Sequence, residues 1–127
     1  MSLTSREFGN RSEDIASDFL KKLGYIIIER NYKTSLGEID IVAYDKDTLV
    51  FIEVKSRRGK RFGVPQASVD KRKQRKIIRV ALNYLANKKI NDKSCRFDIV
   101  AIQQESGSNK ELKLIRNAFE VEDMNLF

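Results

Sequence analysis

Apolar residues in the first part of the chain recur at the spacing of a helix. Between residues 5 and 23 they fall three or four positions apart, and Gly24 follows where the pattern stops. This stripe consists of Phe8, Ile15, Ala16, Phe19, Leu20 and Leu23. Because glycine readily adopts the left-handed conformation that ends many helices, we predict a helix over residues 5–23 that ends at Gly24.

Three segments with the character of strands follow this helix. Residues 25–31 contain three consecutive isoleucines, and a continuous apolar run this short predicts a strand that is covered on both faces. Leu36 and Gly37 mark a turn, and residues 38–44 and 49–56 are two further predicted strands. The connection through residues 45–48 is short, so these two strands form a hairpin.

The second half of the chain begins with a helix and continues with two strands. The helix is predicted from about Asp70, a good N-cap residue, to about Ala86. Its apolar stripe consists of Ile77, Ile78, Ala81, Leu82 and Leu85. Residues 96–103 and 111–116 are predicted strands around a polar loop at 105–109, and we expect 120–127 to be a loosely held tail. The order predicts an α/β (α+β) fold in a single domain, residues 1–127.

The composition restricts the chemistry that the chain can perform. The sequence of 127 residues is 41% hydrophobic, which suffices for one core. It contains no histidine, so Ser/His/Asp triads, histidine-ligated zinc sites and histidine-dependent nucleases are excluded. Cys95 is the only cysteine, which excludes an internal disulfide and a zinc site with several thiolates. Any catalysis must therefore use carboxylates, lysine or a metal ion.

The positive charge of the chain is concentrated between residues 57 and 79. The 25 Lys and Arg residues exceed the 18 Asp and Glu residues, which gives a net charge of +7. Such a surplus serves either solubility or a polyanionic partner, and its clustering favours nucleic acid. The clustered cations are Arg57, Arg58, Lys60, Arg61, Lys71, Arg72, Lys73, Arg75, Lys76 and Arg79. We predict that they bind phosphates.

Two residues at the start of the second helix leave two interpretations open. Lys71 and Gln74 continue the stripe of Ile78 and Leu85. They either face the charged residues of the predicted hairpin and contact phosphate or form an exposed basic turn.

The sequence contains neither a signal-peptide pattern nor an apolar run long enough to span a membrane. We therefore expect a cytoplasmic protein without a membrane partner.

The predicted hairpin brings charged residues together. Alternation along residues 49–56 places Glu53 and Lys55 on one face, and a loop centred on Lys46 and Asp47 sets Asp40 across from Glu53 and Glu38 across from Lys55. Facing carboxylates on apolar strands repel, and a divalent cation such as Mg²⁺ would neutralise them. The simpler alternative is that Lys55 pairs with Glu38 or Glu53 and that Asp40 lies at a sheet edge. The matching register, the apolar neighbours and the basic segment that follows favour the metal site.

These residues resemble the PD-(D/E)xK motif of restriction-endonuclease-like nucleases. Asp40 is followed by Glu53-Val54-Lys55, although Ile39 stands where the proline of the motif would be. Four blocks are similar to the bacterial YraN-type family, which is largely uncharacterised and distantly similar to archaeal Holliday junction resolvases. The blocks are residues 37–43, residues 50–57, Phe62-Gly63 with Pro65, and residues 96–100. Together they extend the resemblance over about residues 9–102.

The resemblance implies an αβββαβ core with a mixed central sheet flanked by helices. It implies that Asp40, Glu53 and the main-chain carbonyl of Val54 hold Mg²⁺ or Mn²⁺, and that Lys55 acts on the attacking water. It also implies a catalytic role for Glu13 on the first helix, although a solvated helix charge is the alternative. We therefore expect a metal-dependent endonuclease that cuts DNA, including branched DNA, and a homodimer would suit cleavage of paired strands. The alternative is a nucleic-acid-binding module that does not cut.

Overall fold

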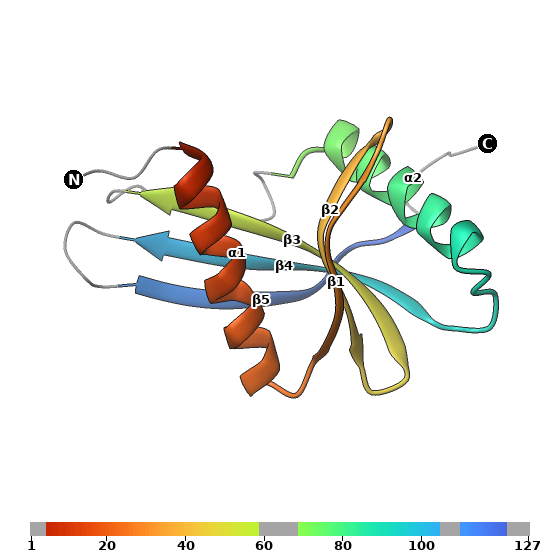
Figure 1. The fold of residues 1–127 in the computed structure, drawn as a ribbon, viewed down its shortest axis with the longest axis horizontal. Coiled ribbons are helices and arrows are strands. Elements are labelled where there is room, and N and C mark those ends of the chain that lie inside the picture. The colour runs from red at the N-terminus through yellow and green to blue at the C-terminus, as the bar shows by residue number, and fades with distance from the viewer. Residues whose placement is uncertain (1–4, 59–68, 105–109, 122–127) are drawn as a thin grey trace.

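The computed structural model describes residues 5–58, 69–104 and 110–121, and these form two helices and five strands (Figure 1). The predicted order of helix, three strands, helix and two strands is confirmed. The elements are α1 (Ser5–Lys22), β1 (Ile26–Thr34), β2 (Gly37–Asp45), β3 (Thr48–Arg58), α2 (Lys71–Asn87), β4 (Cys95–Gln104) and β5 (Lys110–Phe119). The predicted fold class, a mixed sheet with flanking helices, is confirmed as well.

The five strands form one mixed sheet in the order β1-β2-β3-β4-β5. Strands β3 and β4 are parallel, whereas the other neighbouring strands are antiparallel. Figure 1 shows β1 and β2 turning steeply away from the direction of β3, β4 and β5. The sheet is therefore strongly twisted, and the twist is concentrated between β2 and β3.

The two helices cover opposite faces of the sheet, and each face has its own core. On β3, Phe51 packs in the cluster that contains Ile78 of α2, whereas Ile52 packs in the cluster that contains Leu20 of α1. Successive side chains of a strand point to opposite faces, so β3 contributes alternately to the two cores. This central strand therefore holds both layers together.

The predicted helix ends are confirmed in detail. Gly24 has a φ of +96°, its N–H donates to the carbonyl of Lys21, and the N–H of Tyr25 donates to the carbonyl of Leu20. This is the Schellman pattern, in which a glycine ends the helix. The side chain of Asp70 accepts a hydrogen bond from the N–H of Lys73 (2.9 Å), as an N-cap does.

Neither helix of the described residues has the length and apolar character that crossing a membrane requires.

Two predictions about buried apolar residues were wrong. Strand β1 is an edge strand, and Ile26 and Ile28 are 65% and 41% exposed, so it is not covered on both faces. Leu23 and Leu82, which were assigned to the apolar stripes of the two helices, are each 45% exposed, and Val80 and Tyr84 are buried in α2 in place of Leu82. In both cases an apolar residue type was taken as a sign of burial, whereas single apolar residues are common on protein surfaces.

A buried carboxylate joins three parts of the fold. Asp98 of β4 is fully buried and accepts hydrogen bonds from the Tyr25 hydroxyl (2.8 Å), from Arg96 Nε (2.9 Å) and from the main-chain N–H of Asn117 in β5 (3.0 Å). Arg96 Nη2 also pairs with Asp45 Oδ2 at 2.8 Å, at the end of the β2–β3 hairpin. Because a buried charge is tolerated when it is paired and hydrogen-bonded, this network stabilises the fold.

We expect Tyr25→Phe to destabilise the protein by about 1–2 kcal/mol, because it removes one hydrogen bond from a buried carboxylate. The free energy of unfolding, measured by urea denaturation, tests this effect. Tyr44→Phe is the matched control, since Tyr44 is a half-buried tyrosine outside the network. An equal loss of stability in both variants would contradict the role assigned to the Tyr25 hydroxyl.

Candidate active site

The candidate site lies where β2 and β3 separate. Their pairing follows the predicted register around a two-residue loop, Lys46 and Asp47, and runs from Asp45 opposite Thr48 to Ile41 opposite Ile52. Beyond that pair β3 continues beside β4, whereas β2 turns away (Figure 1). Asp40 and Glu53 are the first residues beyond the last pair, so the fork between the two strands begins at these two carboxylates.

Strand β2 changes its orientation at Asp40. Ile39 and Val42 are three residues apart, yet both pack in the core on the α2 side. Regular alternation would place them on opposite faces, and Ile41 does pack on the α1 side. The strand is therefore rotated about its own axis between Ile39 and Val42, and this rotation turns the Asp40 side chain into the fork.

A main-chain hydrogen bond fixes the Asp40 carboxylate. Asp40 Oδ2 accepts the N–H of Val54 at 2.8 Å. If the register of the hairpin continued, Val54 would lie opposite Ile39 and its N–H would face β2. Instead, a side-chain oxygen of Asp40 accepts this hydrogen bond. Asp40 is 9% exposed and Glu53 is 8% exposed. Both predicted carboxylates are therefore buried side by side at the fork.

Two lysines contact Glu53. Lys73 Nζ lies 2.8 Å from Glu53 Oε1, and Lys55 Nζ lies 3.8 Å from the same oxygen. The two lysines are also close enough for each to affect the pKa of the other. Lys55 comes from the same face of β3 as Glu53, whereas Lys73 reaches it from the first turn of α2. The carboxylate of Glu53 is thus shared by a strand lysine and a helix lysine.

Glu13 approaches the site from the other face of the sheet. It is 9% exposed, and the side chains of Asn31 and Asp40 are close enough to act on the pKa of its carboxyl group. Asn31 has a φ of +57°, a left-handed conformation that asparagine tolerates better than most residues. Arg30 beside it pairs with Asp14 at 2.7 Å, which ties this part of α1 to β1. Glu13 is therefore not a solvated helix charge.

Burial and like charge raise the pKa values of two carboxyl groups in the site. The pKa of Asp40 is raised to about 8, first by burial and then by the negative charges of Glu53 and Glu13. Burial is also the main reason that the pKa of Glu13 is raised. In a protein without a cation at this position, Asp40 therefore retains a proton near neutral pH, because its ionised form is costly.

The two lysines respond in opposite directions to the same surroundings. Burial, and then the neighbouring Lys73, lower the pKa of Lys55. Burial is the largest single effect on Lys73 and lowers its pKa, but the neighbouring groups, Glu53 first, together outweigh burial and the pKa is raised. The charged form is therefore favoured at Lys73 and disfavoured at Lys55.

The donor groups fit a hard divalent cation. Asp40 and Glu53 offer carboxylate oxygens, and the main-chain carbonyl of Val54 is the third predicted donor. Within residues 5–58, 69–104 and 110–121, no three or more Cys, Asp or Glu side chains form a metal-binding cluster. An ion held by two carboxylates and one carbonyl would keep several waters, which is the habit of Mg²⁺ rather than of metals that need a full protein cage.

The predicted phosphate-binding residues lie in different places. Arg57 is exposed near the end of β3, and Arg58 is the last residue of that strand. Lys60, Arg61 and the side chain of Arg58 lie outside the described residues, as do residues 122–127 of the predicted tail. The remaining predicted residues are all in α2, and they are Lys71, Arg72, Lys73, Gln74, Arg75, Lys76 and Arg79.

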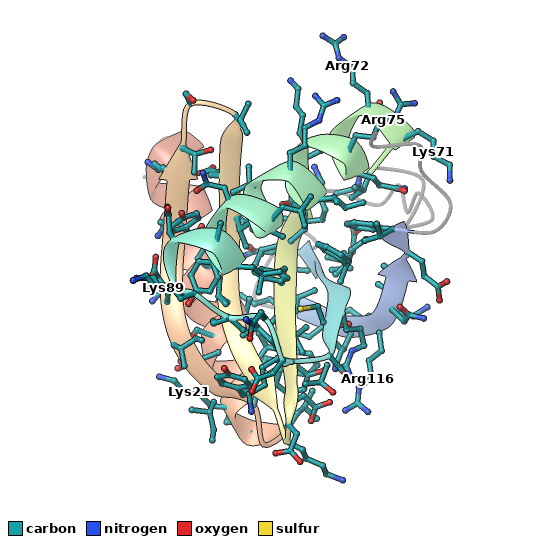
Figure 2. The ribbon with its side chains drawn as sticks, turned by 90° about the vertical axis from the view of Figure 1, so that its right-hand side faces the viewer. Lys21, Lys71, Arg72, Arg75, Lys89 and Arg116 are labelled. Carbon is teal, nitrogen blue, oxygen red and sulfur yellow. The ribbon has the colours of Figure 1, made fainter. Side chains whose placement is uncertain are left out.

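The exposed cations of α2 face away from the sheet. Figure 2 shows Lys71, Arg72 and Arg75 projecting from the first turns of the helix, and all three are exposed. Gln74 is half-buried, and its Nε2 donates to the carbonyl of Val69 at 2.7 Å. Lys71 is thus part of an exposed basic turn, and the amide nitrogen of Gln74 is used within the chain.

Lys73 was predicted as one of the clustered cations and not as a residue of the active site. It lies four residues before Ile77 and seven before Val80, both of which are buried against the sheet. Extending that stripe backwards would have pointed to Lys73, whereas the stripe of Ile78 and Leu85 pointed to Lys71 and Gln74.

Glu38 was predicted to lie opposite Lys55, but β2 has already turned away from β3 at this point. Glu38 is exposed, and its carboxylate pairs with Lys33 of β1 instead.

Comparison with known proteins identifies the family. The model of an uncharacterised protein family, UPF0102, matches residues 12–102, which include the four residues Glu13, Asp40, Glu53 and Lys55. The chain belongs to the UPF0102 family. A UPF0102 protein of Desulfosudis oleivorans is 49% identical over 91% of both chains. Family proteins of Dictyoglomus thermophilum and Clostridium botulinum are 46% and 45% identical over 92% and 95% of this chain, and over 100% of their own.

The raised pKa of Asp40 predicts that stability depends on pH. Its contribution is fully present below the ordinary pKa of 3.8 and is lost as the pH rises through about 8, because the folded protein holds a proton that the unfolded chain releases. In metal-free buffer at pH 9, Asp40→Asn should therefore be more stable than the wild type by at least about 1 kcal/mol.

Thermal unfolding between pH 5 and pH 9 tests this expectation. Asparagine keeps an oxygen for the Val54 N–H, so the variant removes the charge and retains the hydrogen bond. Asp18→Asn, an exposed change on α1, serves as the control and should follow the wild type. A pH profile of Asp40→Asn parallel to that of the wild type would show that Asp40 ionises freely.

Proposed function

We propose that this protein is a metal-dependent endonuclease that hydrolyses phosphodiester bonds in DNA. The observation that carries the proposal is the pair of buried carboxylates at the fork, Asp40 and Glu53, with Lys55 beside them. A buried carboxylate whose charge is opposed by its neighbours is a costly arrangement, and such arrangements are concentrated at functional sites. The resemblance of these residues to the PD-(D/E)xK motif supports the same assignment.

The residues of the site have separable tasks under this proposal. Asp40, Glu53 and the Val54 carbonyl would hold Mg²⁺ or Mn²⁺, which would lower the pKa of a bound water and stabilise charge on the phosphate. Lys55 orients the attacking water or offsets the negative charge that develops during the reaction. The Val54 N–H fixes the Asp40 carboxylate, and the charge of Glu13 acts on it from α1.

The surface of α2 supports a nucleic-acid substrate. Lys71, Arg72 and Arg75 are exposed (Figure 2), and the first turn of the helix carries no acidic residue. Contacts to phosphate fix the position of a nucleic acid without reading its bases, so we propose selection by shape more than by sequence. Branched DNA belongs to this proposal and rests on the resemblance to junction resolvases. Action in the cytoplasm and a homodimer that cuts both strands are proposed with it.

One observation favours a second candidate, a nucleic-acid-binding module that does not cut. Lys73 and Lys55 already neutralise Glu53 in the protein without metal. A site whose cation is supplied by lysine can be purely structural, and the exposed cations of α2 would then be the functional surface. Cleavage and binding measurements distinguish the two candidates.

Cleavage is expected to require a divalent cation and both charged residues. On labelled linear, single-stranded, flapped and four-way-junction DNA, the wild type should cut with Mg²⁺ or Mn²⁺ and not with a chelator. Asp40→Asn and Lys55→Ala should each lower the rate by at least about 100-fold, since each removes a group that stabilises the transition state. Glu38→Gln, an exposed change on the same strand as Asp40, should retain activity. Binding without cutting on every substrate, equal in all variants, would leave the binding module.

Binding is expected to depend on salt through the cations of α2. Arg72→Ala and Arg75→Ala should each reduce the slope of log K against log salt concentration by about 0.7–0.9, the effect of losing one phosphate contact. Fluorescence anisotropy with a short labelled duplex gives this slope. Lys89→Ala, at the far end of α2 in Figure 2, is the control and should leave it unchanged. Equal slopes in all proteins would remove α2 from the binding surface.

A further inference from the structure

Lys73 lies between the candidate site and the exposed cations of α2. Its main-chain N–H is fixed by the Asp70 cap, and its ammonium group reaches inward to Glu53 Oε1 at 2.8 Å. Its neighbours Arg72 and Arg75 in the same turns project outward (Figure 2). Lys73 is therefore the cation of this helix that connects the phosphate-binding surface with the carboxylates.

The bond between Lys73 and Glu53 is asymmetric in its exposure. The side chain of Glu53 is 9% exposed, whereas that of Lys73 is 39% exposed. A lysine side chain with this much access to water can leave the ion pair without carrying a charge into the core. The buried glutamate cannot follow it, and Lys55 then remains as the lysine partner of Glu53.

The site has one lysine more than Glu53 requires. Lys55 is close to the same oxygen at 3.8 Å, and the charges of the two lysines act on each other. Two cations that share one carboxylate repel each other, so the pair is less favourable than a single lysine beside Glu53 would be. A divalent cation at Asp40 and Glu53 would add to that repulsion and favour an outward position of the Lys73 amine.

We propose that Lys73 is a two-position residue. Its ammonium group takes the cation position beside Glu53 in the free protein and moves to a non-bridging phosphate oxygen of the nucleic acid once a divalent cation binds. This proposal rests on the proposed function and adds a residue and a substrate group to it. Metal binding releases Lys73 for a phosphate, and phosphate binding by Lys73 frees Glu53 for the metal. Lys73 thereby links metal binding to substrate binding.

The decisive test measures the affinity of the protein for Mn²⁺ alone, without DNA. Lys73→Ala removes the competing ammonium group, so Mn²⁺ affinity in isothermal titration calorimetry should rise by about two- to fivefold, the range expected for a half-exposed ion pair. Lys73→Arg keeps the charge and should not show this rise. Lys76→Ala, an exposed change in the same helix, is the matched control and should leave Mn²⁺ affinity unchanged.

The second arm measures affinity for a short DNA duplex with and without Ca²⁺. Ca²⁺ should strengthen binding by the wild type and have less effect on Lys73→Ala, whereas Lys76→Ala should weaken binding equally in both conditions. Unchanged or lower Mn²⁺ affinity in Lys73→Ala would overturn the proposal, and so would the absence of Mn²⁺ binding by the wild type. A wild type that binds Mn²⁺ but cuts no DNA would refute the nuclease alone, since the affinity comparison still tests Lys73.

Discussion

The candidate site depends on one hydrogen bond, from the main-chain N–H of Val54 to Asp40 Oδ2. A sheet that simply lost a strand at this point would leave an unsatisfied donor, which costs free energy when it is buried. The carboxylate supplies the missing acceptor, so β2 can turn away from β3 without that loss. The same bond holds the carboxylate beside Glu53. The same hydrogen bond therefore lets β2 leave β3 and holds the acidic pair together, and neither feature needs a specialised loop.

The chain uses the same device at a second aspartate. Asp98 accepts the main-chain N–H of Asn117 where the pairing of β4 with β5 shifts its register, much as Asp40 does at the fork. The two surroundings differ in charge. Asp98 is fully buried and paired with Arg96, whereas burial and two other carboxylates raise the pKa of Asp40. One aspartate is therefore satisfied as an ion within the fold, whereas the surroundings of the other favour its protonated form.

Local patterns were sufficient to predict the elements and the hairpin register. Gly24 and Asp70 each act through backbone geometry within a few residues, and the two-residue loop fixed which residues face each other across the hairpin. Burial was predicted less well, because the exposure of Ile26 depends on β1 being an edge strand, which is a property of the whole sheet. Lys73 was missed for a related reason. Its contact with Glu53 depends on how α2 is rotated against the sheet. Two adjacent apolar stripes of α2 predict different rotations, and so different residues of the first turns facing the site.

The fork also explains how residues on opposite faces of a sheet come to share one site. Elsewhere in this sheet the strands separate the α1 core from the α2 core, and side chains of the two helices pack in different clusters. At the fork the barrier is interrupted, so Glu13 of α1 reaches Asp40 while Lys73 of α2 reaches Glu53. The charge of the site is thus set from both layers. A change in the packing of either helix alters the balance between carboxylates and lysines, so the packing of both cores is a condition for the charge arrangement at the fork.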